Sequence, residues 1–223
     1  EFLHRTWAEI DIDALIHNFK IIKKEAGGAK LMAVVKANAY GHSARITAPV
    51  LEEQGADAFA VSNIEEAITL RGCGITRPVL ILGYTPVSMA PQLYLNDIIQ
   101  CVYSPEYAKA LSEKACEYGV RLKIHIKLDT GMSRIGFDCR DDSLAGLDQA
   151  VAAAKLPGLI FEGIFTHFAA SDRTAETEDG FTAAQYSRFL KGVERFRAER
   201  LDPKFCHCCN SAAFCLDSDK HAD

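Results

Sequence analysis

The sequence of 223 residues lacks long hydrophobic runs, since no stretch approaches the roughly 20 apolar residues that a membrane-spanning helix needs. Its start, EFLHRTWAEI, has neither the basic region nor the apolar centre of a signal peptide. Proline and glycine are sparse, with 7 and 15 residues, and 48% of the chain is hydrophobic. This composition excludes collagen-like, coiled-coil and disordered chains, and we expect a globular, cytoplasmic protein without a membrane partner.

A surplus of positive charge is also missing. The chain has 25 Lys and Arg against 30 Asp and Glu, a net charge of -5, and its basic residues are scattered. Nucleic-acid partners are therefore not expected, because binding to a phosphate backbone needs clustered positive charge. We expect a small-molecule partner instead.

The cysteines do not form a disulfide framework or a clear metal site. Four of them stand singly in apolar or helical contexts and are expected to be buried thiols: Cys73, Cys101, Cys116 and Cys139. A second group is clustered near the end of the chain: Cys206, His207, Cys208, Cys209 and Cys215. Alternate strand positions face opposite ways and no second Cys-x-x-Cys pair is present to complete four ligands, so strand and helix cysteines are favoured over zinc.

Short β-branched runs alternate with longer helical patterns, which indicates βαβ units and a parallel sheet. The predicted strands are 31–36, 56–61, 78–83, 97–103, 121–129, 159–167 and 204–209. The predicted helices are 13–24, with Asp13 as its N-cap, and 44–54, 63–71, 105–118, 143–155 and 182–200. No linker or further sequence repeat divides the chain.

This pattern predicts an α/β fold, a TIM-type (β/α)8 barrel over residues 13–223. Seven strands are predicted, whereas closure of the barrel needs eight. Residues 1–12 contain TWAEIDI, which alternates like a half-buried strand that belongs to another domain. Either the pattern hides one strand, or the eighth strand lies beyond Asp223. The missing initial Met and the ending KHAD indicate a piece of a longer chain.

Active sites of such barrels form at the carboxyl ends of the strands, so polar residues there are candidates. Lys36 ends the first strand, in AVVKANAYGHS. A lysine in a dry barrel mouth is costly unless it is neutralised or used covalently, for example in a Schiff base. The alternative is a lysine that reaches the barrel rim or pairs with a carboxylate.

The fifth and sixth strands end in further polar groups. IKLDTGMSRIGF places Lys127, Asp129 and Arg134 near one rim, although DTG alone could be a turn and Arg134 a surface residue. Thr166 and His167 end the sixth strand, and a histidine there is often a hydrogen-bonded core residue rather than a catalyst.

After the seventh strand, Asn210 and Ser211 open a helix, where a hydroxyl and unpaired backbone N–H groups can bind phosphate. An ordinary N-cap is the alternative. Together with Lys36, this pattern suits a phosphorylated aldehyde cofactor, pyridoxal 5'-phosphate.

Five segments, in order, resemble the N-terminal barrel of bacterial alanine racemases, which are fold-type III pyridoxal-phosphate enzymes: RTWAEIDIDALIHNF, AVVKANAYGHS, IKLDTGMSRIGF, GIFTHFAASD and HCCNSAAF. The resemblance implies an isomerase that interconverts L- and D-alanine for the cell wall. It implies that Lys36 holds the cofactor as an internal aldimine and acts as one proton-transfer base, and that Tyr40 and Ser211 contact the phosphate. It also implies that Arg134 binds the phenolic oxygen of the cofactor and lies by the substrate, and that His167 lies by the pyridine ring.

In many members of the family, a lysine at the position of Lys127 is carbamylated and holds the arginine. Two departures from the family are serines where glycine is common, at Ser43 and Ser133. The family's eighth strand and C-terminal β domain, which residues 1–12 would join, have no counterpart in this sequence.

The resemblance further implies a homodimer in which the partner subunit supplies the second base, so residues 1–223 alone are expected to be poorly active. Three alternatives stay open: a single-domain barrel that binds pyridoxal phosphate without racemising, a serine racemase domain, and a non-catalytic module built on the cysteine cluster.

Overall fold

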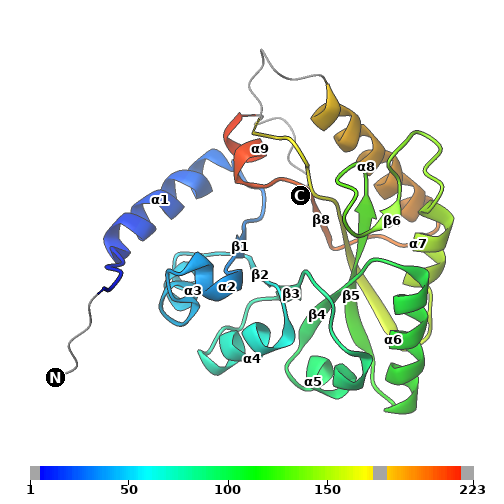
Figure 1. The fold of residues 1–223 in the computed structure, drawn as a ribbon, viewed down its shortest axis with the longest axis horizontal. Helices are drawn as coiled ribbons and strands as arrows, with labels where there is room; N and C mark the ends of the chain where they lie inside the picture. The colour runs from blue at the N-terminus through cyan, green and yellow to red at the C-terminus, as the bar shows by residue number, and fades with distance from the viewer. Residues whose placement is uncertain (1–5, 173–179, 217–223) are drawn as a thin grey trace. The chain divides into compact units, whose positions relative to one another are not determined.

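The computed structural model describes residues 6–172 and 180–216. The chain divides into two compact units, residues 1–83 (unit 1) and residues 84–223 (unit 2). In each unit, parallel strands alternate with helices along the chain, as Figure 1 shows. The α/β class that the sequence predicts is therefore confirmed.

Unit 1 contains a parallel sheet in the order β1-β2-β3, with Ala33 opposite Phe59 and Ala60 opposite Leu80. Strands β2 and β3 are buried along their whole length, and α4 packs against both. The elements are α1 (Ile12–Glu25), β1 (Met32–Val34), α2 (Lys36–Tyr40), α3 (Ala44–Glu53), β2 (Ala58–Val61), α4 (Ile64–Gly72) and β3 (Val79–Ile81).

Unit 2 contains a parallel sheet in the order β4-β5-β7-β8, and the short β6 pairs with the end of β5. Helix α7 packs on β5 and β7, and α5 packs on β4 and β5. The elements are the 3₁₀ turn η1 (Val87–Met89), α5 (Ala90–Leu95), β4 (Ile98–Val102), α6 (Pro105–Glu117), β5 (Leu122–Asp129), β6 (Phe137–Asp138), α7 (Leu147–Ala154), β7 (Leu159–Phe165), α8 (Phe181–Ala198), β8 (Phe205–His207) and α9 (Ser211–Leu216).

All seven predicted strands are present, each within its predicted range, and all six predicted helices form. The sequence did not predict α5, which is short and begins with a proline in its first turn, or the two-residue strand β6. Helix α7 begins at Leu147 rather than at Ser143, because the Asp141 carboxylate accepts hydrogen bonds from the backbone N–H and hydroxyl of Ser143 and holds a turn there.

The predicted N-cap of the first helix was wrong. Asp11, not Asp13, has extended backbone angles and accepts a hydrogen bond from the Ala14 N–H at 2.9 Å. Asp13 lies in the first turn, where its negative charge interacts favourably with the helix dipole. Residues 6–11 form neither helix nor strand, and residues 1–5 of the strand predicted for another domain lie outside the described residues.

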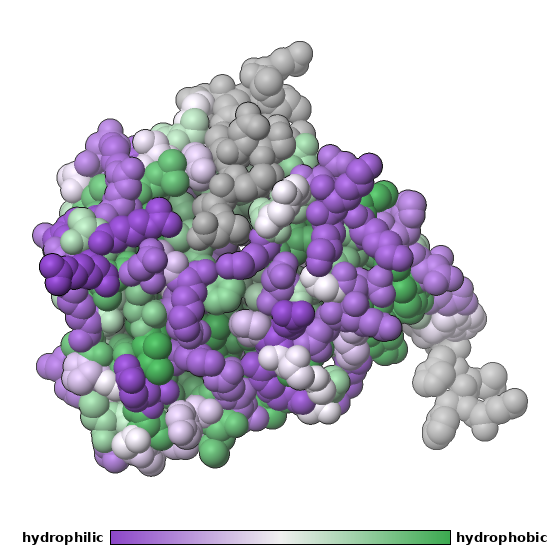
Figure 2. All heavy atoms as spheres, turned by 180° about the vertical axis from the view of Figure 1, so that it is seen from behind, coloured by the Kyte–Doolittle hydropathy of each residue, from purple (hydrophilic) through white to green (hydrophobic). Residues whose placement is uncertain are grey.

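Hydrophobic and hydrophilic side chains are interspersed on the face shown in Figure 2. Large apolar side chains that remain exposed include Trp7, Ile46, Tyr84 and Leu95. Within the described ranges, none of the helices combines the length and the apolar character needed to cross a membrane.

Candidate active site

Lys36 in unit 1 lies two residues after the last residue of β1, Val34, near the carboxyl end of the strand. The ladder between β1 and β2 ends one residue earlier, where the Val35 N–H donates to the Ala60 carbonyl at 2.9 Å. The Lys36 side chain is half-buried, and its Nζ lies 6.0 Å from the centre of the Tyr40 ring, which is itself 60% exposed. Within the described part of the chain, Lys36 forms no ion pair with a carboxylate. The structure thus brings together two of the predicted site residues, at a strand end that is open to solvent.

The segment after Lys36 is a left-handed turn. Residues 37–40 have φ between 50° and 54°, although none of them is glycine. Left-handed backbone costs roughly 1–2 kcal/mol per residue for side chains other than glycine, so contacts must hold this turn. The Asn38 amide oxygen accepts from the Ala44 N–H at 3.0 Å, and the His42 Nδ1 lies 3.1 Å from the Ala39 carbonyl oxygen.

Glu66 of α4 contributes two further contacts to this region that the sequence analysis missed. One carboxylate oxygen accepts from the Ala37 N–H and the other from the Ser62 N–H, both at 2.8 Å. The pattern Asn63-x-x-Glu66, a capping signal at a helix start, is the sequence feature that could have drawn attention to it.

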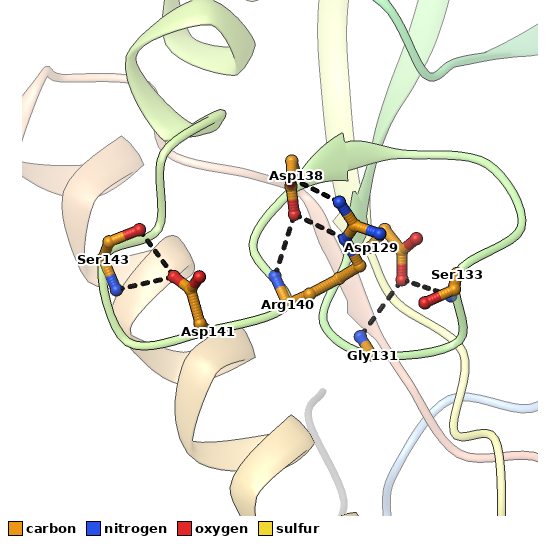
Figure 3. Close-up of polar contacts among 7 residues, drawn as sticks. All are labelled: Asp129, Gly131, Ser133, Asp138, Arg140, Asp141 and Ser143. Carbon is orange, nitrogen blue, oxygen red and sulfur yellow. Dashed lines mark hydrogen bonds and ion pairs between the residues drawn. The ribbon is translucent and has the colours of Figure 1, made fainter.

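In unit 2, Lys127 and Asp129 lie on one face of β5, two residues apart. Lys127 is only 4% exposed, and its Nζ lies 5.6 Å from the centre of the Phe165 ring. The Asp129 carboxylate accepts from the N–H groups of Gly131 and Ser133, at 3.1 and 3.0 Å, through the same oxygen atom (Figure 3). The DTG motif is therefore a turn in this structure.

Arg134 lies in the loop between β5 and β6 and is exposed. The nearby Arg140 forms two hydrogen bonds of 2.8 Å with the Asp138 carboxylate, as Figure 3 shows, and these bonds lower the pKa of Asp138 to about 2. Arg134 makes no comparable bond with any residue in the described ranges.

The segment after β7 carries Thr166 and His167. The buried Thr166 hydroxyl lies 2.7 Å from the Thr130 hydroxyl, and His167 is half-buried. The amide nitrogen of Gln185, in α8, donates to the His167 carbonyl at 3.2 Å and to the Thr130 hydroxyl at 3.3 Å. Gln185 thus links the segments after β5 and β7. Its signal in the sequence is a polar residue on the apolar stripe of a helix, between Phe181 and Phe189.

Asn210 behaves as the N-cap that was one of its two interpretations. Its side-chain oxygen accepts from the Ala213 N–H at 2.9 Å and from the Ser171 hydroxyl at 2.7 Å. Ser211 is exposed at the first position of α9. The phosphate contacts of these two residues stay predictions.

His125 and His207 form a pair that the sequence analysis did not foresee. The His125 Nδ1 lies 3.0 Å from the His207 Nε2, across Gly163 of β7, where a Cβ atom would lie only 2.7 Å from the His125 ring. Phe165 stacks on His207 at 4.6 Å. Burial lowers the pKa of His207 to about 3, and burial together with the neighbouring His207 holds the pKa of His125 well below its usual range. Both imidazoles are therefore neutral at pH 7.

The predicted cysteine environments are only partly correct. Cys101 and Cys139 are buried, and burial raises the pKa of each thiol to about 12, but Cys116 is exposed and Cys73 is half-buried because their helix-end positions face outward. In the cluster, Cys206 and Cys208 are buried whereas Cys209 and Cys215 are exposed. Among the residues the structure describes, no three His, Cys, Asp or Glu side chains are grouped as metal ligands.

Comparisons with known proteins show the family of the chain. The family described as "Alanine racemase, N-terminal domain" matches residues 10–223. The alanine racemase of Clostridium perfringens SM101 is 44% identical over 207 residues, which cover 93% of this chain and 52% of that protein, and the enzyme of Clostridium tetani is 44% identical over 95% of this chain and 53% of its own length. The chain thus spans about half the length of the curated relatives it matches.

Solved structures give the same result for the fold. Alanine racemase of Clostridium difficile 630, in complex with cycloserine, superposes with a TM-score of 0.90 at 34% identity, covering 99% of this chain and 59% of that chain. A histidine racemase of Leuconostoc mesenteroides superposes with a TM-score of 0.77 at 30% identity, covering 95% of this chain and 54% of that one. The predicted incomplete TIM-type barrel is confirmed, with seven barrel strands among the described residues.

Proposed function

The chain belongs to the alanine racemase family, and we propose that it interconverts L- and D-alanine with pyridoxal 5'-phosphate as its cofactor. The observation that carries this proposal is Lys36. It is a half-buried amine at the carboxyl end of a parallel strand, held by a strained turn beside Tyr40, without a carboxylate partner in the described part of the chain. A lysine that is not neutralised by a salt bridge is suited to covalent chemistry with an aldehyde.

Each unit contains functional groups of the kind that such a cofactor needs. Unit 1 contains the amine of Lys36 and the exposed phenol of Tyr40, and unit 2 contains the exposed guanidinium of Arg134, the exposed hydroxyl of Ser211 and the half-buried imidazole of His167. The cofactor's aldehyde can react with an amine, its phosphate can accept hydrogen bonds from hydroxyl groups, and its phenolic oxygen can pair with a guanidinium cation.

In the proposed reaction, pyridoxal phosphate supplies an electron sink that stabilises the negative charge left at the substrate Cα. Lys36 holds and moves a proton at that Cα on one face of the substrate. Tyr40, Asn210 and Ser211 would hold the phosphate, and His167 would lie by the pyridine ring. Arg134 binds the phenolic oxygen and orients the substrate.

For Lys127 we propose carbamylation. Its burial beside Phe165 makes a charged ammonium costly. Reaction with carbon dioxide forms a bond from Nζ to carbon, releases a proton and leaves an anion. That anion would attract Arg134 rather than repel it.

At the level of the complete protein, we propose a cytoplasmic homodimer whose partner subunit supplies the second base, and which makes D-alanine for the cell wall. The family of the chain supports this proposal. The histidine racemase neighbour favours keeping a second substrate class in the assay, because a similar barrel is found in an enzyme named for another amino acid.

The test is borohydride reduction of the protein expressed from its complete gene, after incubation with pyridoxal phosphate, followed by peptide mapping. We expect the reduced cofactor, a phosphopyridoxyl group, to label Lys36. We also expect D-alanine to form from L-alanine, with L-serine and L-histidine assayed in parallel. A label on another lysine would contradict the assignment. A label on Lys36 without any racemisation would favour a binding protein over an enzyme.

A further inference from the structure

The carboxylate of Glu66 connects the segment that carries Lys36 to the neighbouring strand. One oxygen accepts from the Ala37 N–H and the other from the Ser62 N–H, each at 2.8 Å. Ala37 is the residue directly after Lys36, and Ser62 is the first residue after β2. Glu66 itself lies 29 residues from Ala37 in the sequence, in the first turn of α4.

These two N–H groups are the donors that one more rung of the sheet would use. The register of β1 and β2 pairs Val34 with Ala60. The next hydrogen-bonded pair, two residues further along each strand, would set Lys36 opposite Ser62. In a parallel ladder, that pair would need the N–H groups of Ser62 and Ala37 as its donors. Glu66 accepts both of them instead, so the sheet ends before Lys36.

One of the two acceptors of that rung, the Val35 carbonyl, is also used elsewhere. The Val35 carbonyl, which would accept from Ser62 in the ladder, accepts from the Ala39 N–H at 2.9 Å within the left-handed turn. The turn and the longer strand are therefore mutually exclusive arrangements of the same backbone groups. The acceptor that Glu66 provides favours the turn.

Helix capping explains only part of this arrangement. Asn63 is the N-cap of α4, and its side chain accepts from the Glu66 N–H at 2.9 Å. The Glu66 side chain in turn accepts from the N–H of Ser62, the residue before the cap, in an arrangement similar to a capping box. The bond to Ala37 leaves the helix and has no role in capping. A variant can therefore separate the two roles.

We propose that Glu66 is a positioning residue for Lys36: it ends β1 and holds the left-handed turn that sets the direction of the lysine side chain. This inference rests on the proposed function of Lys36. Without Glu66, β1 can extend by one pair, and because strand residues alternate between faces, Lys36 would take the orientation of a strand residue instead of its present one.

The decisive variant is Glu66→Gln in the protein expressed from its complete gene. The two N–H groups meet different oxygens of Glu66, so in this geometry the single oxygen of a glutamine can accept from only one of them, and its amide nitrogen faces the other. We expect the rate of covalent capture of pyridoxal phosphate by Lys36 to fall about 10- to 100-fold, since a misplacement of about 1 Å has effects of this size. We expect kcat to fall with KM nearly unchanged.

A control shares the location but not the contact. Glu65→Gln makes the same change of charge at an exposed neighbouring position in the first turn of α4. It should retain the wild-type rate of capture. Hydrogen exchange supplies a readout independent of the cofactor: only Glu66→Gln should change the protection of the Ala37 and Ser62 amides.

The outcomes separate the inference from the proposed function. If wild-type protein is not labelled at Lys36, the proposed function fails. If wild-type protein is labelled and Glu66→Gln matches Glu65→Gln in capture rate and amide protection, the role of Glu66 is wrong. If Glu66→Gln does not fold, Glu66→Asp keeps the charge with a shorter reach, and a wild-type capture rate in that variant would equally overturn the inference.

Discussion

The turns after β1 and after β5 each end a parallel strand with a carboxylate that accepts two backbone N–H groups. After β5 the carboxylate is that of Asp129, the last residue of the strand, and both bonds go to one oxygen from residues two and four positions later. After β1 the carboxylate is that of Glu66, from a helix beyond the next strand, and each oxygen accepts one bond. The first turn is local in sequence, whereas the second depends on tertiary structure.

This difference determines how each turn should respond to the same chemical change. An amide retains one acceptor oxygen, which is all that Asp129 uses, so Asp129→Asn preserves its turn. Glu66 uses both oxygens, so Glu66→Gln does not. Both turns contain left-handed residues other than glycine, at residues 37–40 and at Ser133, and both precede or carry a proposed site residue.

Substitution of Lys36, which precedes the turn after β1, should have the largest effect on activity. We expect Lys36→Ala to lower turnover at least about 10⁴-fold, because both the covalent attachment and an acid/base group, worth roughly 10²–10⁴-fold by itself, are lost. D-alanine formation and borohydride labelling measure it. Lys24→Ala, on α1, is the control and should retain both signals; imine absorbance that persists in Lys36→Ala would contradict the assignment.

Truncation of the carboxylate in the β5 turn should have the next largest effect. We expect Asp129→Ala to lower the free energy of unfolding by about 2–3 kcal/mol, since a buried charged acceptor of two N–H groups is lost. Asp129→Asn should cost less than about 1 kcal/mol. Urea unfolding measures both variants, and equal losses for Ala and Asn would show that charge rather than geometry holds the turn.

The next prediction concerns the pH dependence of stability that the pair of His125 and His207 should cause. Because the native pKa values of His125 and His207 lie below the unfolded value of about 6.5, the unfolded state binds more protons in acid. Stability is therefore complete above pH 6.5 and decreases as the pH falls towards the native pKa of His207, about 3.

Between pH 7 and pH 5, we expect His207 to lower the free energy of unfolding by about 2 kcal/mol, and His125 to act in the same direction. His207→Gln should reduce this loss in urea unfolding at the two pH values. His17→Gln, which changes an exposed histidine of α1, should leave it unchanged. An identical pH dependence in wild type and His207→Gln would refute the neutral pair.

The smallest effect on stability is expected at two serines with left-handed backbone angles. One lies in the segment after Lys36 and the other in the turn after β5. Ser43 and Ser133 have φ of 63° and 57°, in the left-handed region that favours glycine. Ser43→Gly and Ser133→Gly should each raise the free energy of unfolding by at most about 1 kcal/mol, because relief of left-handed strain is partly offset by the entropy that glycine adds to the unfolded chain. Ser187→Gly, inside α8, should lower it; a loss in all three variants would remove the argument from strain.

Sequence patterns alone located the seven strands, the six longer helices and Lys36 at a strand end. These features depend on contacts that are close in sequence: the run of β-branched residues, the helical period and the strand-end position. The Asp129 turn belongs to the same class, since its partners lie within four residues. The assignment of Asp13 as a cap failed because two aspartates two residues apart carry the same local signal, and the backbone angles selected Asp11.

Only the tertiary structure decided how the strand ends are held. Glu66 reaches Ala37 across 29 residues, Gln185 reaches Thr130 across 55, and His125 meets His207 across 82. No local preference of these residues specifies such contacts, because they exist only once parallel strands and their helices have packed in register. The left-handed turn after Lys36 has the same origin: its residues disfavour that conformation individually, and it persists through bonds to groups that folding brings to it.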